Sequence, residues 1–491
     1  MSTLEEKPAE KSEKPEPADQ ISITRHRAWL RDRDIAYTVT CGTMVLREEA
    51  EKEGKSEGEK PRARVFFVAY TLDDVADKSA RPLTFSFNGG PGSSSVWLHL
   101  GLLGPKRVAL DDEGRAPAPP GKLVPNEFSL LADSDLVFID PVGTGFSRMV
   151  EGETLKEYHD YRRDLESVGS FIRLYTSRYG RWMSPKYLIG ESYGTTRASG
   201  LSAHLIERYG MYLNGVMLVS CALDFQVLRF DPANDLPYVL FLPTYAATAW
   251  YHKRLAADLQ AKPLRAVLDE VEAFAGNEYS HALFLGSSLA PEARAKIVKK
   301  VARYTGLTPE YVERTNLRVM ILRFCKELLR DQGRTVGRLD SRYTGFDRDS
   351  AGEHFEFDPG WAEIFGVYAA AMNDYARSDL RFEADVPYEV IKPLYMTWGW
   401  NDFANRYASV GETLRKAMSM NPKMRVLVAS GYYDFATPHF GADYSITHLG
   451  LAPELRGNIA VSYYEAGHMM YAHKPSLAKL AEELRRFVTA G

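Results

Sequence analysis

The chain has 491 residues, of which 45% are hydrophobic and 12% aromatic, enough apolar material for a sizeable buried core. A formal net charge of −4 leaves no basic field to hold nucleic acid or an anionic membrane surface, so we expect neither as a partner. No apolar run approaches the ~18 residues of a membrane span. The three cysteines lack the spacing of a zinc or redox site, and we expect free thiols, no metal and no cofactor.

The first 21 residues are rich in Glu, Lys and Pro and predict a disordered tail. They contain no apolar signal-peptide core, which favours a cytoplasmic protein, or a periplasmic or secreted one if a signal segment has been removed. The next apolar segments, 35–49 and 63–74, predict two strands. The charged stretch between them, EAEKEGKSEGEKP, predicts a solvated hairpin loop.

Six short apolar runs follow, each ending in turn or helix-start residues, as in strands buried on both faces of a parallel sheet. They are PLTFSF, DLVFID, KYLIG, VMLVS, KMRVLVASG and GNIAVSYYEAG. Between residues 225 and 385 helical patterns replace them, including one continuous helix over 308–329 with Thr308 as N-cap. We therefore predict an α/β-hydrolase fold, a mostly parallel sheet flanked by helices, formed by 22–224 and 386–491, with 225–385 inserted as a helical cap.

Residues 190–194, GESYG, match the GxSxG pattern, in which a serine occupies a sharp turn between a strand and a helix. The pattern alone is weak evidence. Here, however, a predicted strand, KYLIG, precedes it and a predicted helix follows it. We therefore predict that Ser192 is a catalytic nucleophile.

A serine hydroxyl needs a base, and in this architecture the acid and then the histidine follow the serine along the chain. His468 has the best position among the downstream histidines, because it follows a strand and precedes the terminal helix. Asp434 ends the preceding strand and is preferred as the acid over Asp402. We expect Asp434 to hold the imidazole tautomer and stabilise the imidazolium.

Acyl transfer also requires two backbone N–H groups facing the developing oxyanion. The residue after the nucleophile, Tyr193, supplies the first. The glycine-rich loop NGGPG over 88–92 supplies the second, with Gly90 preferred and Gly89 next, because glycines let the main chain approach a substrate oxygen closely. Phosphate binding by this loop is disfavoured, since it has neither GxGxxG nor GxxxxGK[ST].

With these residues in hand, the chain resembles the serine carboxypeptidase family and particularly its bacterial members. The resemblance rests on FNGGPGSSS, LGPKRV, FIDPVGTGFS, GESYG, GYYDF and AGHM, in the order that the family has them. It implies that Ser192, Asp434 and His468 form the triad and that Gly90 and Tyr193 form the oxyanion hole. It also implies that Asn88, Gly89 and Glu191 bind the substrate, with Asn88 and Glu191 on its terminal carboxylate.

Two positions depart from the family pattern. Ser86 stands where the family usually has tryptophan, and Leu102 stands where it has a glutamate that shares a proton with the equivalent of Glu191. Without that like charge, we expect Glu191 to lose much of the cause of an upward pKa shift and, once ionised, to repel a terminal carboxylate. The predicted function is a serine-dependent, carboxypeptidase-like peptidase on a peptide or small acyl substrate. An esterase, amidase or acyltransferase is the alternative, and a non-catalytic binding protein a third.

Overall fold

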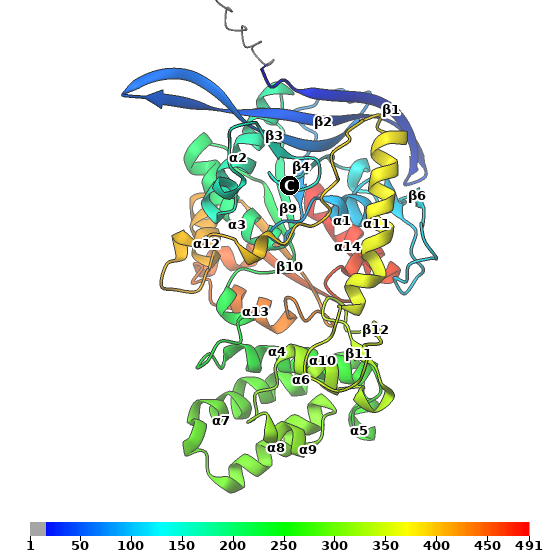
Figure 1. Ribbon diagram of the computed structural model, residues 1–491, viewed down its shortest axis with the longest axis vertical. Helices are drawn as coiled ribbons and strands as arrows, with labels where there is room; N and C mark the ends of the chain where they lie inside the picture. Colours follow the sequence, from blue (N-terminus) through cyan, green and yellow to red (C-terminus); the bar gives the residue numbers. More distant parts are fainter. Residues whose placement is uncertain (1–15, 491) are drawn as a thin grey trace, which may run out of the picture.

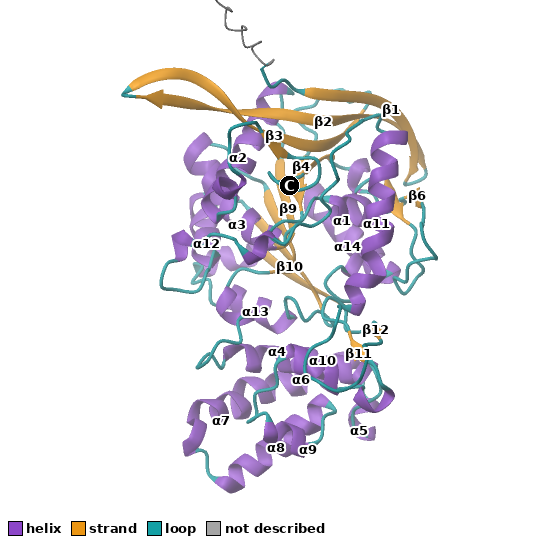
Figure 2. Ribbon diagram, viewed as in Figure 1, coloured by secondary structure: helices purple, strands orange, loops and turns teal. Residues whose placement is uncertain are grey.

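A computed structural model describes residues 16–490 of the chain. The central sheet has the strand order β1-β2-β3-β7-β4-β9-β10-β13-β14, and β8 (Arg148–Met149) pairs with β3. Strands β7, β4, β9, β10, β13 and β14 run parallel, whereas β1, β2 and β3 add an antiparallel edge (Figures 1 and 2). The six parallel strands are the six apolar runs, β4 (Leu83–Phe87), β7 (Asp135–Ile139), β9 (Lys186–Ser192), β10 (Gly215–Cys221), β13 (Arg425–Gly431) and β14 (Ile459–Tyr464). The predicted α/β class is confirmed.

Alternating side chains of these strands enter two hydrophobic cores, one on each face of the sheet. In β9, Tyr187 and Ile189 join one core and Leu188 joins the other. Helices cover both faces, so nearly every strand residue is buried, which explains the continuous apolar runs. The first face carries α1 (Val96–Leu98), α11 (Pro359–Ser378) and α14 (Lys474–Thr489); the second carries α2 (Tyr161–Arg178), α3 (Tyr193–Tyr209), α12 (Gly411–Met420) and α13 (His439–Thr447).

The charged stretch after residue 49 is a pair of strands, and the prediction of a hairpin loop there is wrong. β2 (Arg33–Lys52) and β3 (Lys55–Leu72) stay paired as far as Lys52 and Lys55 and form the long projecting arm of Figure 1. The turn is only Glu53 and Gly54, whose φ values of 53° and 76° fit a two-residue hairpin turn. Backbone pairing needs no apolar side chains, so the ladder continues where both faces are exposed.

Residues 1–15 of the predicted tail lie outside the described residues. β1 (Gln20–Leu30) was not predicted and overlaps the last two residues of the predicted tail. It pairs antiparallel with β2 over its whole length and forms the edge of the sheet. Its side chains alternate between exposed and half-buried, which explains the weak apolar signal.

The helices between residues 236 and 327 pack around a hydrophobic core of their own, at the bottom of Figure 1. Thr308 caps a helix as predicted, because its side chain accepts a hydrogen bond from Tyr311 N. The predicted single helix over 308–329 is nevertheless broken, since Asn316 and Leu317 have left-handed φ values of 54° and 64°. The helices are α4 (Leu236–Tyr251), α5 (Ala257–Gln260), α6 (Leu264–Phe274), α7 (Ser280–Leu285), α8 (Pro291–Thr305), α9 (Pro309–Arg314) and α10 (Ile321–Glu327).

Helix α11 does not belong to this insertion, although the predicted boundary of 225–385 places it there. Its residues Ile364, Tyr368 and Tyr375 are buried in the core on the first face of the sheet, and α11 contacts α1. The apolar stripe of α11 therefore covers the sheet instead of the inserted helices. The short strands β11 (Thr335–Val336) and β12 (Thr344–Gly345) precede it, and β5 (Lys106–Val108) and β6 (Leu123–Pro125) form a third small ladder.

The cysteine prediction is confirmed, because Cys41, Cys221 and Cys325 are all buried free thiols. Within residues 16–490, no group of three or more His, Cys, Asp or Glu side chains has an arrangement that would hold a metal ion. None of the helices in that range combines the length and apolarity needed to cross a bilayer.

Candidate active site

Ser192 lies at the sharp turn between β9 and α3, at the carboxyl end of a central strand. Its φ of 59° and ψ of −128° are strained for a residue with a side chain, as expected of a serine held out on such a turn. A Cβ atom on Gly190 would overlap the Gly194 carbonyl oxygen, and one on Gly194 would lie 2.9 Å from Phe87 O. The two glycines of the motif therefore allow the turn to close.

His468 and Asp434 form a buried pair in the loops that follow β14 and β13. Their Nδ1 and Oδ2 atoms lie 2.7 Å apart. Asp434 also accepts hydrogen bonds from Ala436 N at 2.7 Å and from Thr437 N at 3.1 Å, which fix its orientation. Burial would lower the pKa of His468, but the negative charge and hydrogen bond of Asp434 outweigh it and hold that pKa above its ordinary value.

Asp402, the alternative candidate for the acid, contacts α2 and does not contact His468. Its carboxylate pairs with the exposed Arg162 on α2, at 3.0 Å from Arg162 Nε. The structure therefore brings Asp434, and not Asp402, to His468.

Ser192 and His468 both line one cavity of about 740 Å³. Within residues 16–490, no hydrogen bond joins the serine hydroxyl to the imidazole. In ligand-free hydrolases this contact is often long and tightens when substrate binds. The assignment of the triad remains a prediction, with its three members placed at the carboxyl ends of β9, β13 and β14.

The glycine-rich loop after β4 packs directly against the turn that carries Ser192. A Cβ atom on Gly89 would lie 2.5 Å from Tyr193 N and 2.7 Å from Glu191 O, so only glycine fits there. Gly90 has a φ of 105°, which other residues rarely adopt. Asn88, Gly89, Gly90 and Tyr193 all line the cavity, as an oxyanion hole built from this loop and the nucleophile turn requires.

A buried ion pair ties this loop to α3. Arg197 donates to the Asn88 carbonyl oxygen at 2.7 Å and to Asp164 Oδ2 at 2.8 Å. Tyr193 OH donates to the same Asp164 oxygen at 3.0 Å. This network holds both sides of the proposed oxyanion hole. It was not predicted, because Arg197 and Asp164 carry no motif and meet only when α2 packs on α3.

Glu191 is buried, and its environment differs from the one expected. Burial raises its pKa to about 7, with the hydrogen bond from Tyr471 OH, 2.5 Å from Glu191 Oε2, opposing that rise. The expectation that Glu191 loses much of the cause of an upward pKa shift is therefore wrong, because burial is the largest cause and raises the pKa without a carboxyl at position 102. Asn88 lies beside it, and Asn88 Nδ2 has no hydrogen-bond partner among the described residues.

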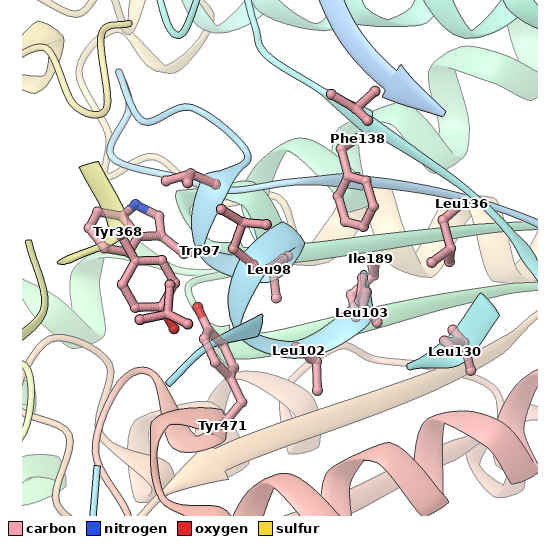
Figure 3. Close-up of a cluster of buried hydrophobic side chains, with 14 of the residues drawn as sticks. Trp97, Leu98, Leu102, Leu103, Leu130, Leu136, Phe138, Ile189, Tyr368 and Tyr471 are labelled. Atoms are coloured by element: carbon pink, nitrogen blue, oxygen red, sulfur yellow. The ribbon is translucent and has the colours of Figure 1, made fainter. Parts of the chain in front are cut away.

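Leu102 lies in the apolar cluster of Figure 3, together with Leu103, Leu130 and the rings of Tyr368 and Tyr471. A Cβ atom on Gly101 would lie 2.5 Å from the Tyr471 ring and 2.7 Å from Tyr368 OH, so the two tyrosines fill the space next to this segment. The side-chain partner of Glu191 is thus a phenol instead of a second carboxyl. Tyr471 follows His468 by three residues, and nothing in its local sequence indicated this role.

The rest of the cavity wall is mostly apolar, with several aromatic rings, two arginines and one carboxylate, Asp358. Trp97, Phe225, Phe241, Trp361, Tyr395 and Trp400 supply the rings, and Arg229 and Arg338 the cations. A wall of this kind suits a peptide or acyl chain with apolar side chains.

Comparisons with known proteins relate part of the chain to serine carboxypeptidases. The family model for serine carboxypeptidases matches residues 55–227. The pheromone-processing carboxypeptidase KEX1 of Saccharomyces cerevisiae is 36% identical over 162 residues, which cover 31% of this chain and 20% of that protein. Serine carboxypeptidase-like 29 of Arabidopsis thaliana is 28% identical over 141 residues, 28% of each chain.

The matched segments thus span only 20% and 28% of these two relatives' own lengths. The similarity in three dimensions is wider. The crystal structure of the prohormone-processing carboxypeptidase of Saccharomyces cerevisiae superposes with a TM-score of 0.57 at 17% identity, over 92% of this chain and 91% of that one. The chain is therefore related to the serine carboxypeptidase family, through the segment that carries the glycine-rich loop and Ser192.

Proposed function

We propose that the protein is a serine-dependent peptidase of the carboxypeptidase type that acts through an acyl-enzyme. The observation that supports it best is the meeting of the strained Ser192, the His468–Asp434 pair and the glycine-rich loop on one cavity. Each of these three features also occurs by itself in proteins of other function, whereas acyl transfer requires all of them together.

In the proposed reaction Ser192 Oγ attacks the scissile carbonyl carbon and its proton passes to His468 Nε2. The N–H groups of Tyr193 and Gly90 stabilise the resulting oxyanion. Collapse of the tetrahedral intermediate breaks the C–N bond, and His468 returns the proton to the departing amine. A water molecule, activated by His468 in the same way, then hydrolyses the ester and releases Ser192.

Glu191 and Asn88 give this reaction its exopeptidase character. With a pKa of about 7, the Glu191 carboxyl is mostly neutral in mildly acidic solution. A neutral carboxyl can donate a hydrogen bond to a substrate carboxylate, and the Asn88 amide can donate a second. The fully ionised Glu191 would instead repel it. Tyr471 OH bonds Glu191 Oε2, which leaves Oε1 as the oxygen for the substrate in this proposal.

The test compares blocked peptides that end in a free acid with the same peptides ending in an amide, at pH 6. We expect kcat/KM to favour the acids, and mass spectra of the products to show loss of the C-terminal residue. Equal rates on acids and amides would contradict the carboxypeptidase assignment. Cleavage restricted to small esters would instead support the esterase alternative.

A further inference from the structure

Arg338 has a firmly held main chain in the cavity wall, on the segment that leads from the inserted helices back towards α11. Its N–H donates to Asp358 Oδ1 at 2.9 Å, and its carbonyl oxygen accepts a hydrogen bond from Phe435 N at 3.0 Å, next to Asp434. The following residue continues this contact, because Leu339 O accepts a hydrogen bond from His468 N. Arg338 is thus anchored to both loops that carry the acid and the base.

The guanidinium of Arg338, in contrast, has no hydrogen bond, ion pair or aromatic partner among residues 16–490. The nearby carboxylates are engaged elsewhere. Asp358 accepts from the N–H groups of Arg338, Leu339 and Gly360, and Glu191 accepts from Tyr471. Asp434 is paired with His468.

Arg338 also differs from Arg229, the other cation of the cavity. Arg229 is exposed and lies 3.8 Å from Asp231, whereas Arg338 is half-buried. Apolar side chains form much of the cavity wall around it, and a half-buried charge is screened by salt and water less than an exposed one. The positive charge of Arg338 acts on the imidazole of His468, because it lowers the pKa of His468 and so opposes the rise that Asp434 causes.

We propose that Arg338 is a specificity-determining residue that binds a carboxylate of the substrate, supplied by an acidic side chain next to the scissile bond. A guanidinium presents a fork of N–H groups that matches a carboxylate, and its anchored main chain lowers the cost of ordering it. The C-terminal carboxylate of the substrate could also bind a guanidinium, but the proposed function assigns that carboxylate to Asn88 and Glu191. This inference rests on the proposed function and extends it to peptides with Asp or Glu flanking the cleaved bond.

The experiment measures kcat/KM for blocked dipeptides and tripeptides with Glu or Gln on either side of the scissile bond, each as a free acid and as an amide. In the unmodified protein we expect a clear preference for Glu over Gln. Because a hydrogen bond to a charged group is worth about 1.5–3 kcal/mol, Arg338→Gln should reduce the Glu/Gln ratio roughly tenfold to a hundredfold. Arg338→Glu should invert it, so that the Gln peptide is cleaved faster than the Glu peptide. A matched Lys peptide, added for this variant, should be cleaved faster still.

Arg334→Gln is the matched control, because Arg334 lies on the same segment but bonds to Thr344 and stacks over Phe346, outside the cavity. It should leave the Glu/Gln ratio unchanged. An unchanged ratio in Arg338→Gln, or a loss confined to the difference between acids and amides, would overturn the assignment to an acidic side chain.

A second measurement separates this inference from the proposed function. If no peptide is hydrolysed, the labelling of Ser192 by a fluorophosphonate is followed in the presence of N-acyl-glutamate or N-acyl-glutamine amides. Stronger protection by the glutamate ligand, lost in Arg338→Gln, would support the carboxylate site even though peptidase activity is absent. Equal protection by both ligands would overturn it.

Discussion

Replacing Tyr471 by phenylalanine tests how the protein controls the charge of Glu191. The phenol donates a hydrogen bond to Glu191 Oε2 at 2.5 Å, and this bond favours the ionised carboxylate against the effect of burial. A hydrogen bond to a charged group contributes about 1.5–3 kcal/mol, and one pKa unit corresponds to about 1.4 kcal/mol. The substitution should therefore raise the pKa of Glu191 from about 7 by roughly one to two units.

The assay is the pH dependence of kcat/KM for a peptide acid and its amide. In the unmodified protein both rates rise with pH as His468 loses its proton, at a pH above the ordinary pKa of 6.5. Only the acid should then lose rate above about pH 7, because Glu191 ionises and repels its carboxylate. In Tyr471→Phe this alkaline decline should move up by one to two pH units.

Tyr368→Phe is the control for this experiment. Tyr368 lies near Glu191 but makes no hydrogen bond to it within the described chain. In Tyr368→Phe the decline of kcat/KM for the peptide acid at high pH should therefore occur at the same pH as in the unmodified protein. An alkaline limb that does not move in Tyr471→Phe, or that appears equally for the amide, would refute the role given to Glu191.

Three further changes probe the site and its supports. Asp434→Asn should lower kcat roughly 10⁴-fold, because the amide no longer holds the imidazole tautomer; single-turnover acylation measures this, and a loss below tenfold would contradict it. Arg197→Met leaves the buried charge of Asp164 without its cation, so urea unfolding should show a loss of about 3–5 kcal/mol, partly restored by adding Asp164→Asn; no restoration would argue against the pair. Thr308→Ala removes a helix cap and should cost about 1 kcal/mol, seen as faster hydrogen exchange in α9 and unchanged exchange in α3.

The elements that follow from local pattern were predictable from the sequence. The buried strands are continuous apolar runs, and the serine turn is marked by Gly190 and Gly194 around Ser192. The order of serine, acid and histidine along the chain is a property of the topology, so Asp434 and His468 could be chosen from their places after successive strands.

Features that depend on tertiary contacts or on the backbone alone could not be predicted in this way. Tyr471 and Arg197 act through partners far away in the sequence, and neither belongs to a local pattern. The stripe of α11 is equally compatible with packing on a cap or on a sheet, and only the folded chain decides between them. The charged arm of β2 and β3 is held by backbone pairing, which leaves no hydrophobic periodicity in the sequence to detect.

The role of Ser192 as an activated nucleophile is tested most directly by peptide mapping with mass spectrometry after reaction with a fluorophosphonate. We expect a single covalent adduct on the peptide that contains Ser192, absent in Ser192→Ala and much slower to form in Asp434→Asn. Failure of the folded protein to form an adduct, or an adduct that persists in Ser192→Ala, would contradict this role.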